Sequence, residues 1–164
     1  MPKSLEGLRI LDIGCNAGIF CVRAALAGAE EIVGIESDDW KKGERFWEQA
    51  QFVKAHFEEM HGRKLNIKYI KGRMEDLLWT DLGWFDYVLA IAAIYYSNTP
   101  ERTVEALSKL TNNVIARIRD KNRIERFETL FPKYGFTLVR SLQEKWWEKL
   151  GRNTDDFWLF HYAK

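Results

Sequence analysis

The sequence predicts an α/β fold in which helices cover both faces of a seven-stranded, mostly parallel sheet with one antiparallel strand. Short apolar runs alternate with segments of helical periodicity along the whole 164-residue chain. This alternation is typical of a parallel sheet that helices cover. The last two apolar runs have no room for a helix between them. A link of that length allows an antiparallel pair but is too short for a parallel crossover.

The strands are predicted from short apolar runs that turn signals bound. The fourth run is almost continuously apolar, which indicates burial on both of its faces. The seven predicted strands are Arg9–Ile13, Glu31–Glu36, Asn66–Lys71, Phe85–Ile91, Asn113–Arg119, Phe136–Trp146 and Phe157–Ala163.

The helices are predicted from apolar residues at helical spacing and from signals at their ends. Gly28 and Gly62 end the first two helices, and Pro100 lies in the first turn of a later one. Pro132 and Gly135 are expected to end the last helix. The predicted helical segments are Gly18–Ala27, Trp40–His61 with an apolar stripe of Trp47, Ala50, Val53, Phe57 and Met60, a short turn at Glu75–Leu78, a helix beginning near Thr99–Pro100, and Asn122–Phe131.

Composition indicates an ordinary globular protein with a single domain over residues 1–164. The chain is 46% hydrophobic and 30% charged, with a net charge of +1, so no overall charge draws it to nucleic acid or membrane. No apolar run is long enough to span a bilayer and no signal peptide is recognised, so we expect a cytoplasmic protein. Cys15 and Cys21 are six residues apart without partner ligands, which favours buried, reduced thiols over a metal site.

A glycine-containing turn after the first strand and an acid at the end of the second indicate a nucleoside site. Gly14 and Gly18 let the backbone approach a ligand, and Glu36 can accept hydrogen bonds from two ribose hydroxyls. The dinucleotide fingerprint needs glycine at its first, third and sixth positions. Asn16 and Ile19 stand at the third and sixth, so an NAD(P)-dependent oxidoreductase is a weaker alternative. A tight turn that binds no ligand is the other interpretation of the glycines.

Four segments of the chain follow one another at separations that fit such a site: Asp12–Gly18, Val33–Glu36, Lys71–Leu77 and Phe85–Ala90. Together they resemble the motifs of class I S-adenosylmethionine-dependent methyltransferases. The resemblance implies a Rossmann-like methyltransferase fold that binds S-adenosylmethionine. Within the family, the run Gly72-Arg73-Met74-Glu75 looks more like the subgroup of wobble-uridine tRNA methyltransferase-like proteins and O-antigen chain-terminating methyltransferases.

The same resemblance implies which residues bind the cofactor. In the family, the acid at the position of Asp12 helps to hold the methionine end, directly or through water, and the acid at Glu36 binds the ribose. The cofactor-binding residues expected on this basis are Asp12, Gly14, Cys15, Asn16, Gly18, Glu36, Ser37, Met74, Glu75 and Ala90.

The third motif departs from the commoner family pattern. Arg73 stands where many members have an aspartate that binds the adenine amine. We therefore expect the Met74 backbone amide and side chain to contact the adenine ring. Glu75 or Asp76 is expected to take the amine, although Glu75 at the start of a short helix needs no such role.

The methyl acceptor is expected beyond the fourth strand, at Ala92–Asn98. This segment lacks the Asn/Asp-Pro-Pro-Tyr/Phe motif that family members use for adenine or amide nitrogens, and the chain has no Pro-Cys nucleophile. A hydroxyl, a carboxyl or a more basic amine is therefore favoured as acceptor. An oxygen acceptor on a small molecule, glycan or modified nucleoside is the first choice, and the net charge does not indicate nucleic acid. Tyr95 and Tyr96 are the candidate catalytic residues. They either line the acceptor pocket and act on a proton or are core aromatics at a strand end.

Two further features leave alternatives open. The basic residues near the fifth strand face either an anionic substrate or solvent, where neighbouring acids balance them; they are Arg117, Arg119, Lys121, Arg123 and Arg126. Trp146 and Trp147, in a loop between the last strands, form either a partner surface or core filling.

Little chain precedes the first strand, so no N-terminal helical cap is expected. A cofactor-binding subunit that supports a protein partner is therefore an alternative to an independent enzyme.

Overall fold

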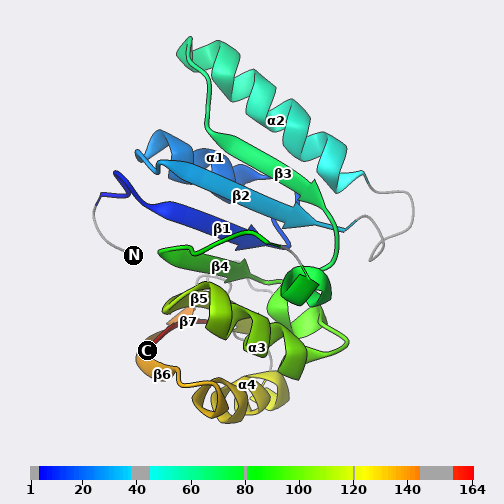
Figure 1. Cartoon of the computed structure of the whole chain (residues 1–164), viewed down its shortest axis with the longest axis vertical. Helices are drawn as coiled ribbons and strands as arrows, with labels where there is room; N and C mark the ends of the chain where they lie inside the picture. The colour runs from blue at the N-terminus through cyan, green and yellow to red at the C-terminus, as the bar shows by residue number, and fades with distance from the viewer. Residues whose placement is uncertain (1–3, 38–44, 80, 120, 145–156) are drawn as a thin grey trace, which may run out of the picture.

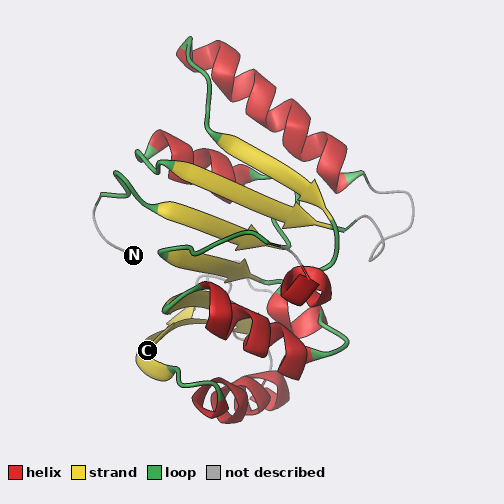
Figure 2. Ribbon diagram, viewed as in Figure 1, coloured by secondary structure: helices red, strands yellow, loops and turns green. Residues whose placement is uncertain are grey.

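The computed structural model describes residues 4–37, 45–79, 81–119, 121–144 and 157–164. Within these ranges strands and helices alternate as predicted (Figure 1 and Figure 2). The elements in chain order are β1 (Arg9–Ile13), α1 (Ile19–Leu26), β2 (Glu31–Glu36), α2 (Phe46–His61), β3 (Ile67–Lys71), the 3-10 helix η2 (Met74–Trp79), β4 (Tyr87–Ile91), the 3-10 helix η3 (Ile94–Tyr96), α3 (Pro100–Leu110), β5 (Asn113–Arg119), α4 (Lys121–Lys133), β6 (Thr137–Glu144) and β7 (Phe157–Ala163).

All seven strands form one sheet in the order β3-β2-β1-β4-β5-β7-β6. The strands β1 to β5 pair in parallel, and β7 runs antiparallel to both β5 and β6. The predicted sheet with its single antiparallel strand is therefore confirmed. Because β1 pairs with β2 on one side and with β4 on the other, the strand order reverses at β1. Open parallel sheets bind ligands at such a reversal, outside the carboxyl ends of the strands.

Two buried clusters lie on opposite faces of the sheet. On β1, Ile10 belongs to the cluster that includes α1, whereas its neighbour Leu11 belongs to the cluster that includes α3 and α4. Successive side chains of a strand point to opposite faces, so helices cover both faces, as predicted. Figure 1 shows α2 beyond β3 at one edge of the sheet, with α3 and α4 near the other end.

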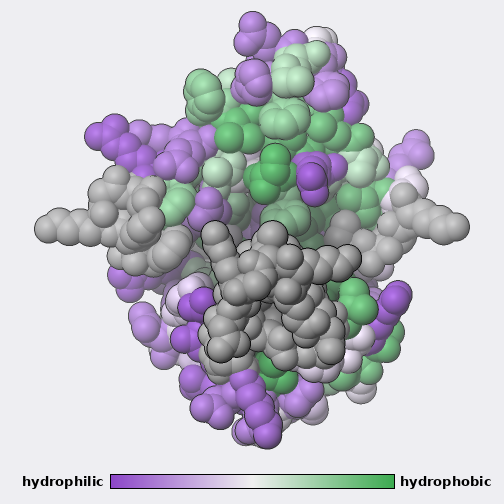
Figure 3. Space-filling model, turned by 180° about the vertical axis from the view of Figure 1, so that it is seen from behind, coloured by the Kyte–Doolittle hydropathy of each residue, from purple (hydrophilic) through white to green (hydrophobic). Residues whose placement is uncertain are grey.

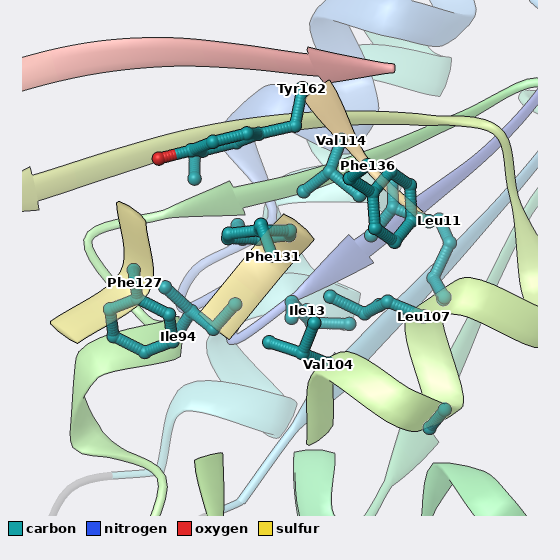
Figure 4. Packing of buried hydrophobic residues seen from close by; sticks show 14 of the residues in the cluster. Leu11, Ile13, Ile94, Val104, Leu107, Val114, Phe127, Phe131, Phe136 and Tyr162 are labelled. Atoms are coloured by element: carbon teal, nitrogen blue, oxygen red, sulfur yellow. The ribbon is translucent and has the colours of Figure 1, made fainter. Parts of the chain in front are cut away.

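Aromatic side chains fill the cluster beneath α4 (Figure 4). The ring of Phe131 stacks on that of Tyr162, with centroids 4.0 Å apart, and meets Phe136 edge-on at 5.5 Å. All three side chains are almost completely buried. These contacts join α4 to β7, the antiparallel strand.

Helix α2 ends at His61, before Gly62, as predicted, but its start and its buried face differ from the prediction. Residues 38–44, which contain most of its predicted first turns, lie outside the described ranges, and the helix is described from Phe46. Within its predicted apolar stripe, Ala50 is fully buried but Met60 is 63% exposed. The stripe is only partly covered because α2 lies at the edge of the sheet, beyond β3 (Figure 1).

Some apolar side chains remain exposed. Figure 3 shows apolar residues gathered in the upper half of the face opposite to that of Figure 1. The large apolar side chains of α1 and α2 that are at least 40% exposed are Ile19, Phe20, Phe52 and Met60. In the described ranges, no helix is both long enough and apolar enough to cross a membrane.

The C-terminal elements also differ from the prediction at their boundaries. Helix α4 includes Pro132 and ends at Lys133, because a proline in the last turn removes only one intrahelical hydrogen bond. Gly135, with φ of +85°, ends the helical path, and the amide of Phe136 donates to the carbonyl of Phe131 at 3.2 Å. The predicted tryptophan pair and its loop, residues 145–156, lie outside the described ranges.

Candidate functional site

A cleft lies at the carboxyl ends of β1, β2 and β4, where the strand order reverses. Its volume is about 390 Å³, which is typical of small-molecule sites. The lining residues are Gly14, Asn16, Ile35, Glu36, Ser37, Gly72, Arg73, Met74, Glu75, Ile91, Ala92, Ala93, Tyr95, Tyr96 and Asn98. The predicted cofactor and catalytic residues among them are Gly14, Asn16, Glu36, Ser37, Met74, Glu75, Tyr95 and Tyr96.

The turn between β1 and α1 is fastened to the end of β2. The amides of Gly14 and Cys15 both donate to the carbonyl of Ile35, at 2.8 and 3.0 Å. Gly14 has φ of +66°, and a Cβ added there would lie 2.4 Å from the Cβ of Ala93. Only glycine therefore allows the turn to approach the end of β4 this closely. Asn16 has φ of +50°, a conformation that asparagine tolerates better than most residues.

Glu36 ends β2 with a buried carboxylate, since the residue is only 5% exposed. One carboxylate oxygen accepts the Asn16 amide at 2.5 Å, and the other accepts the Ser37 amide at 2.8 Å. A buried charge requires such donors, and hydrogen bonds to a charged group are among the stronger ones. The two bonds therefore hold the carboxylate in a fixed orientation at the cleft, between the glycine turn and the end of β2.

Asp12 lies in the middle of the sheet and does not line the cleft. Its side chain is 1% exposed, and the thiol of Cys21 in α1 donates to its Oδ2 at 3.3 Å. Burial raises the pKa of Asp12 to about 7, the hydrogen bond from Cys21 opposes that rise, and the charge of Glu36 adds to it. The pKa of the Cys21 thiol is also raised, by its hydrogen bond with Cys15 and by burial. Asp12 thus lies outside the residues that line the cleft, and its predicted role at the methionine end of the cofactor stays a prediction.

Three other predicted cofactor residues are buried and do not line the cleft, so their contacts to a ligand stay predictions. Cys15 and Ala90 are buried, and Cys15, like Cys21, is a free thiol. Gly18 has φ of +76°, and a Cβ there would lie 2.2 Å from the hydroxyl oxygen of Tyr69. Within the described ranges, no three His, Cys, Asp or Glu side chains are placed to hold a metal ion.

The helix η2 borders the cleft beside β3. Met74 and Glu75 begin it, at the position where the sequence predicts adenine contacts. The carboxylate of Glu75 accepts the amide of Asn98 at 2.8 Å, and the amide of Gly72 donates to the carbonyl of Glu36 at 2.9 Å. These bonds connect the segment Gly72–Glu75, which leads into η2, to the end of β2 and to the segment after β4.

Tyr95 and Tyr96 follow β4 and line the cleft at the end predicted for the methyl acceptor. Their ring centroids are 4.6 Å apart, and Tyr96 is 47% exposed. Burial raises the pKa of Tyr95 to about 12, and the neighbouring Tyr96 adds to the rise. Tyr95 therefore keeps its proton at neutral pH, so it is suited to donate a hydrogen bond and not to act as a base.

Two apolar lining residues were not predicted. Ile35 directly precedes Glu36 and Ile91 is the last residue of β4, so their places at predicted strand ends are the signal that would have indicated them. The segment that follows contains Ala92 with φ of +59°, a left-handed conformation that is uncommon for alanine. Nothing in the sequence indicates that conformation.

Comparison with known proteins identifies the class. A family model described as a methyltransferase domain matches residues 1–147. A tRNA U34 carboxymethyltransferase of Alcanivorax borkumensis is 34% identical over 98 residues, which make up 60% of this chain and 27% of that protein. A ribosomal protein L11 methyltransferase of Stenotrophomonas maltophilia is 28% identical over 155 residues, 94% of this chain and 42% of that protein. The matches thus span less than half the length of either relative.

Solved structures agree with this class. The crystal structure of an arsenic(III) S-adenosylmethionine methyltransferase from Chlamydomonas reinhardtii matches with a TM-score of 0.72 at 19% identity, over 99% of this chain and 64% of that one. The chain belongs to the methyltransferase domain family. Its fold is the class I, Rossmann-like methyltransferase fold that the motifs predicted, and the family indicates S-adenosylmethionine as the cofactor. An NAD(P)-dependent oxidoreductase is correspondingly disfavoured.

Proposed function

We propose that the chain binds S-adenosylmethionine in the cleft and transfers its methyl group to an oxygen acceptor that enters beside Tyr95 and Tyr96. The observation that carries the proposal is the carboxylate of Glu36, buried at the sheet edge and oriented by the Asn16 and Ser37 amides. A carboxylate oxygen has more than one lone pair, so each oxygen that accepts an amide can also accept a ribose hydroxyl.

The remaining lining residues fit the rest of the cofactor. Met74 and Glu75 border the side of the cleft beside β3, where the adenine ring would lie next to the ribose. Gly14 lines the cleft where its turn approaches the end of β4, and the methionine portion would lie beside it. Asp12, behind this turn, would act on the methionine ammonium through its charge or through water.

The cofactor supplies a methyl group already activated by a positively charged sulfur. The protein's contribution is then mainly to hold donor and acceptor in line, which can account for several kcal/mol of the barrier. Tyr95, protonated at neutral pH because burial raises its pKa to about 12, would donate a hydrogen bond that orients the acceptor. Tyr96, the more exposed of the two, would contact the acceptor at the cleft entrance.

The segment after β4 argues against adenine and amide nitrogens as acceptors and leaves a hydroxyl, a carboxyl or a more basic amine, among which oxygen is our first choice. Ile91-Ala92-Ala93-Ile94 stands where family members that methylate adenine or amide nitrogens carry an Asn/Asp-Pro-Pro-Tyr/Phe motif. The names of the two relatives refer to a tRNA and to a ribosomal protein. A modified nucleoside of RNA and a protein side chain are therefore acceptors to test beside small molecules and glycans.

Transfer of a tritiated methyl group from the cofactor into fractionated RNA, protein and metabolite extracts tests the proposal. Label is expected in one fraction. At limiting cofactor concentration it should be strongly reduced with Glu36→Ala and kept with Glu31→Ala. Glu31 is the matched control because it lies at the other end of β2, where it pairs with Arg9 at 2.6 Å. Release of the label by mild base would support an ester acceptor, and label confined to nitrogen or carbon would contradict the oxygen preference.

A cofactor-binding subunit without activity of its own is the second candidate. It is favoured by the exposure of Tyr96, 47%, which leaves the acceptor end of the cleft open to a partner protein. Cofactor binding without transfer to any fraction would support this candidate over the first.

A further inference from the structure

Beside the cleft lies a cluster of two tyrosines and two arginines to which the proposed cofactor site assigns no contact. We call it the Tyr–Arg wall, and it consists of Tyr95 and Tyr96 after β4, Arg119 at the end of β5 and Arg123 in α4. Both tyrosines line the cleft. The strands β4 and β5 pair in parallel, and β1 and β4 separate β5 from β2 in the sheet. The wall therefore stands at the end of the cleft away from Glu36, on the acceptor side.

The two guanidinium groups lie against the tyrosine rings. That of Arg123 is 4.8 Å from the ring centroid of Tyr95 and 5.7 Å from that of Tyr96. That of Arg119 is 5.8 Å from the Tyr95 centroid and donates to the Tyr96 hydroxyl oxygen at 3.3 Å. All these ring distances are within the range of cation–π contacts. The contacts hold two positive charges next to the acceptor end of the cleft, and both arginines are partly buried.

Four of the five residues of the predicted basic cluster thus divide into two parts. Arg126 pairs with Glu101 at 3.3 Å, and Lys121 pairs with Glu125 at 3.7 Å, all at exposed positions. These pairs form an ordinary solvated helix face. In the part of the chain that the structure describes, the contacts of the Arg119 guanidinium are instead with Tyr95 and Tyr96.

We propose that the Tyr–Arg wall binds an oxyanion, a carboxylate or a phosphate, that the methyl acceptor carries close to its methylated atom. This inference rests on the proposed function and names the substrate class. Planar guanidinium groups match the two oxygens of a carboxylate or phosphate, and Tyr95 and Tyr96 fix the direction in which the guanidinium of Arg119 is presented. The carboxylate of Glu75 also lines the cleft, but it is held by the Asn98 amide at 2.8 Å.

Ligand-observed NMR tests whether the Tyr–Arg wall binds an oxyanion. The protein is titrated with inorganic phosphate and, separately, with benzoate, which distinguishes a phosphate from a carboxylate as the bound group. The protein is used both loaded with S-adenosylhomocysteine and unloaded. At least one oxyanion should bind saturably at millimolar concentration, and Arg119→Gln should weaken that binding at least tenfold. Arg126→Gln is the matched control, because it removes the same charge from the neighbouring solvated face and should leave binding unchanged.

The outcomes are distinguishable from failure of the proposed function. S-adenosylhomocysteine should bind equally to the wild type and to both variants, since neither arginine lines the cleft. Absence of saturable oxyanion binding to the wild type, or equal weakening by Arg119→Gln and Arg126→Gln, would overturn the wall as a specific site. If S-adenosylhomocysteine itself does not bind, the proposed function fails, and the titrations of the unloaded protein still decide whether the wall binds oxyanions.

Discussion

Asp12 and Glu36 are buried acids on the adjacent strands β1 and β2, and their different surroundings give them different chemistry. Glu36 accepts two backbone amides, which stabilise its charged form. Asp12 accepts only a thiol hydrogen bond among its described contacts, and a thiol is a weak donor. Burial therefore dominates at Asp12 and raises its pKa to about 7. Glu36 is therefore suited to bind hydroxyls, whereas Asp12 makes the stability of the fold depend on pH.

We predict that Asp12→Asn changes the dependence of stability on pH. In the wild type the unfolded carboxyl ionises near its ordinary pKa of 3.8 and the folded one only near 7. Stability should therefore fall as pH rises between these values, and stay lowered above pH 7, where both forms are ionised. Since one pKa unit corresponds to about 1.4 kcal/mol, the cost at pH 8 is on the order of 4 kcal/mol.

Urea denaturation between pH 4 and pH 8 measures this effect. The gain in unfolding free energy of Asp12→Asn over the wild type should be small at pH 4 and grow steadily to pH 7. Parallel stability curves for the two proteins would show that Asp12 does not titrate in this range.

At the scale of elements, the turn between β1 and α1 is the most constrained segment of the site. We predict that Gly14→Ala lowers the unfolding free energy by about 2–4 kcal/mol, from the unfavourable φ and the clash with Ala93. Gly72→Ala is the matched control, because Gly72 also lines the cleft but a Cβ there meets nothing within 4 Å. Chemical denaturation of both variants checks the prediction, and similar losses in both would contradict the tight approach.

The elements could be predicted well where one local signal decides them. The observed bounds of β1, β2, β5 and β7 are those expected, because short apolar runs end there in glycines or charged residues. The end of α4 could not be predicted from Pro132, since the tolerance of a proline depends on which backbone carbonyls need partners. The exposure of Met60 depends on where the sheet ends beneath α2, which no local pattern records.

The residues of the candidate site likewise differ in whether a local signal or the packing of distant elements positions them. Gly14, Asn16 and Glu36 could be placed at the cleft because backbone conformation and strand ends position them. Asp12 could not, because its direction depends on which face of β1 it occupies and on how α1 packs there. The separation of Arg119 from the solvated basic residues likewise required the contact between the ends of β4 and β5.

At the scale of the whole molecule, the aromatic cluster connects α4 and the antiparallel end of the sheet to the strands that carry the cleft. We predict that Phe131→Ala lowers the unfolding free energy by about 3–5 kcal/mol, because it removes a fully buried ring that contacts Tyr162 and Phe136. Phe52→Ala, at a position that is 73% exposed, should change it by less than about 0.5 kcal/mol. Thermal and urea unfolding of both variants distinguish the two cases.

Isothermal titration calorimetry of the folded protein with S-adenosylmethionine, S-adenosylhomocysteine and NAD tests the central claim most directly. Both sulfur ligands should bind at one site and NAD should not. Glu36→Ala should weaken their binding by about 1–3 kcal/mol, the scale of hydrogen bonds to a charged group, while Glu31→Ala should bind as the wild type does. Absence of binding by both sulfur ligands at millimolar concentration would contradict the account, and unchanged affinity in a folded Glu36→Ala variant would contradict the role of its carboxylate.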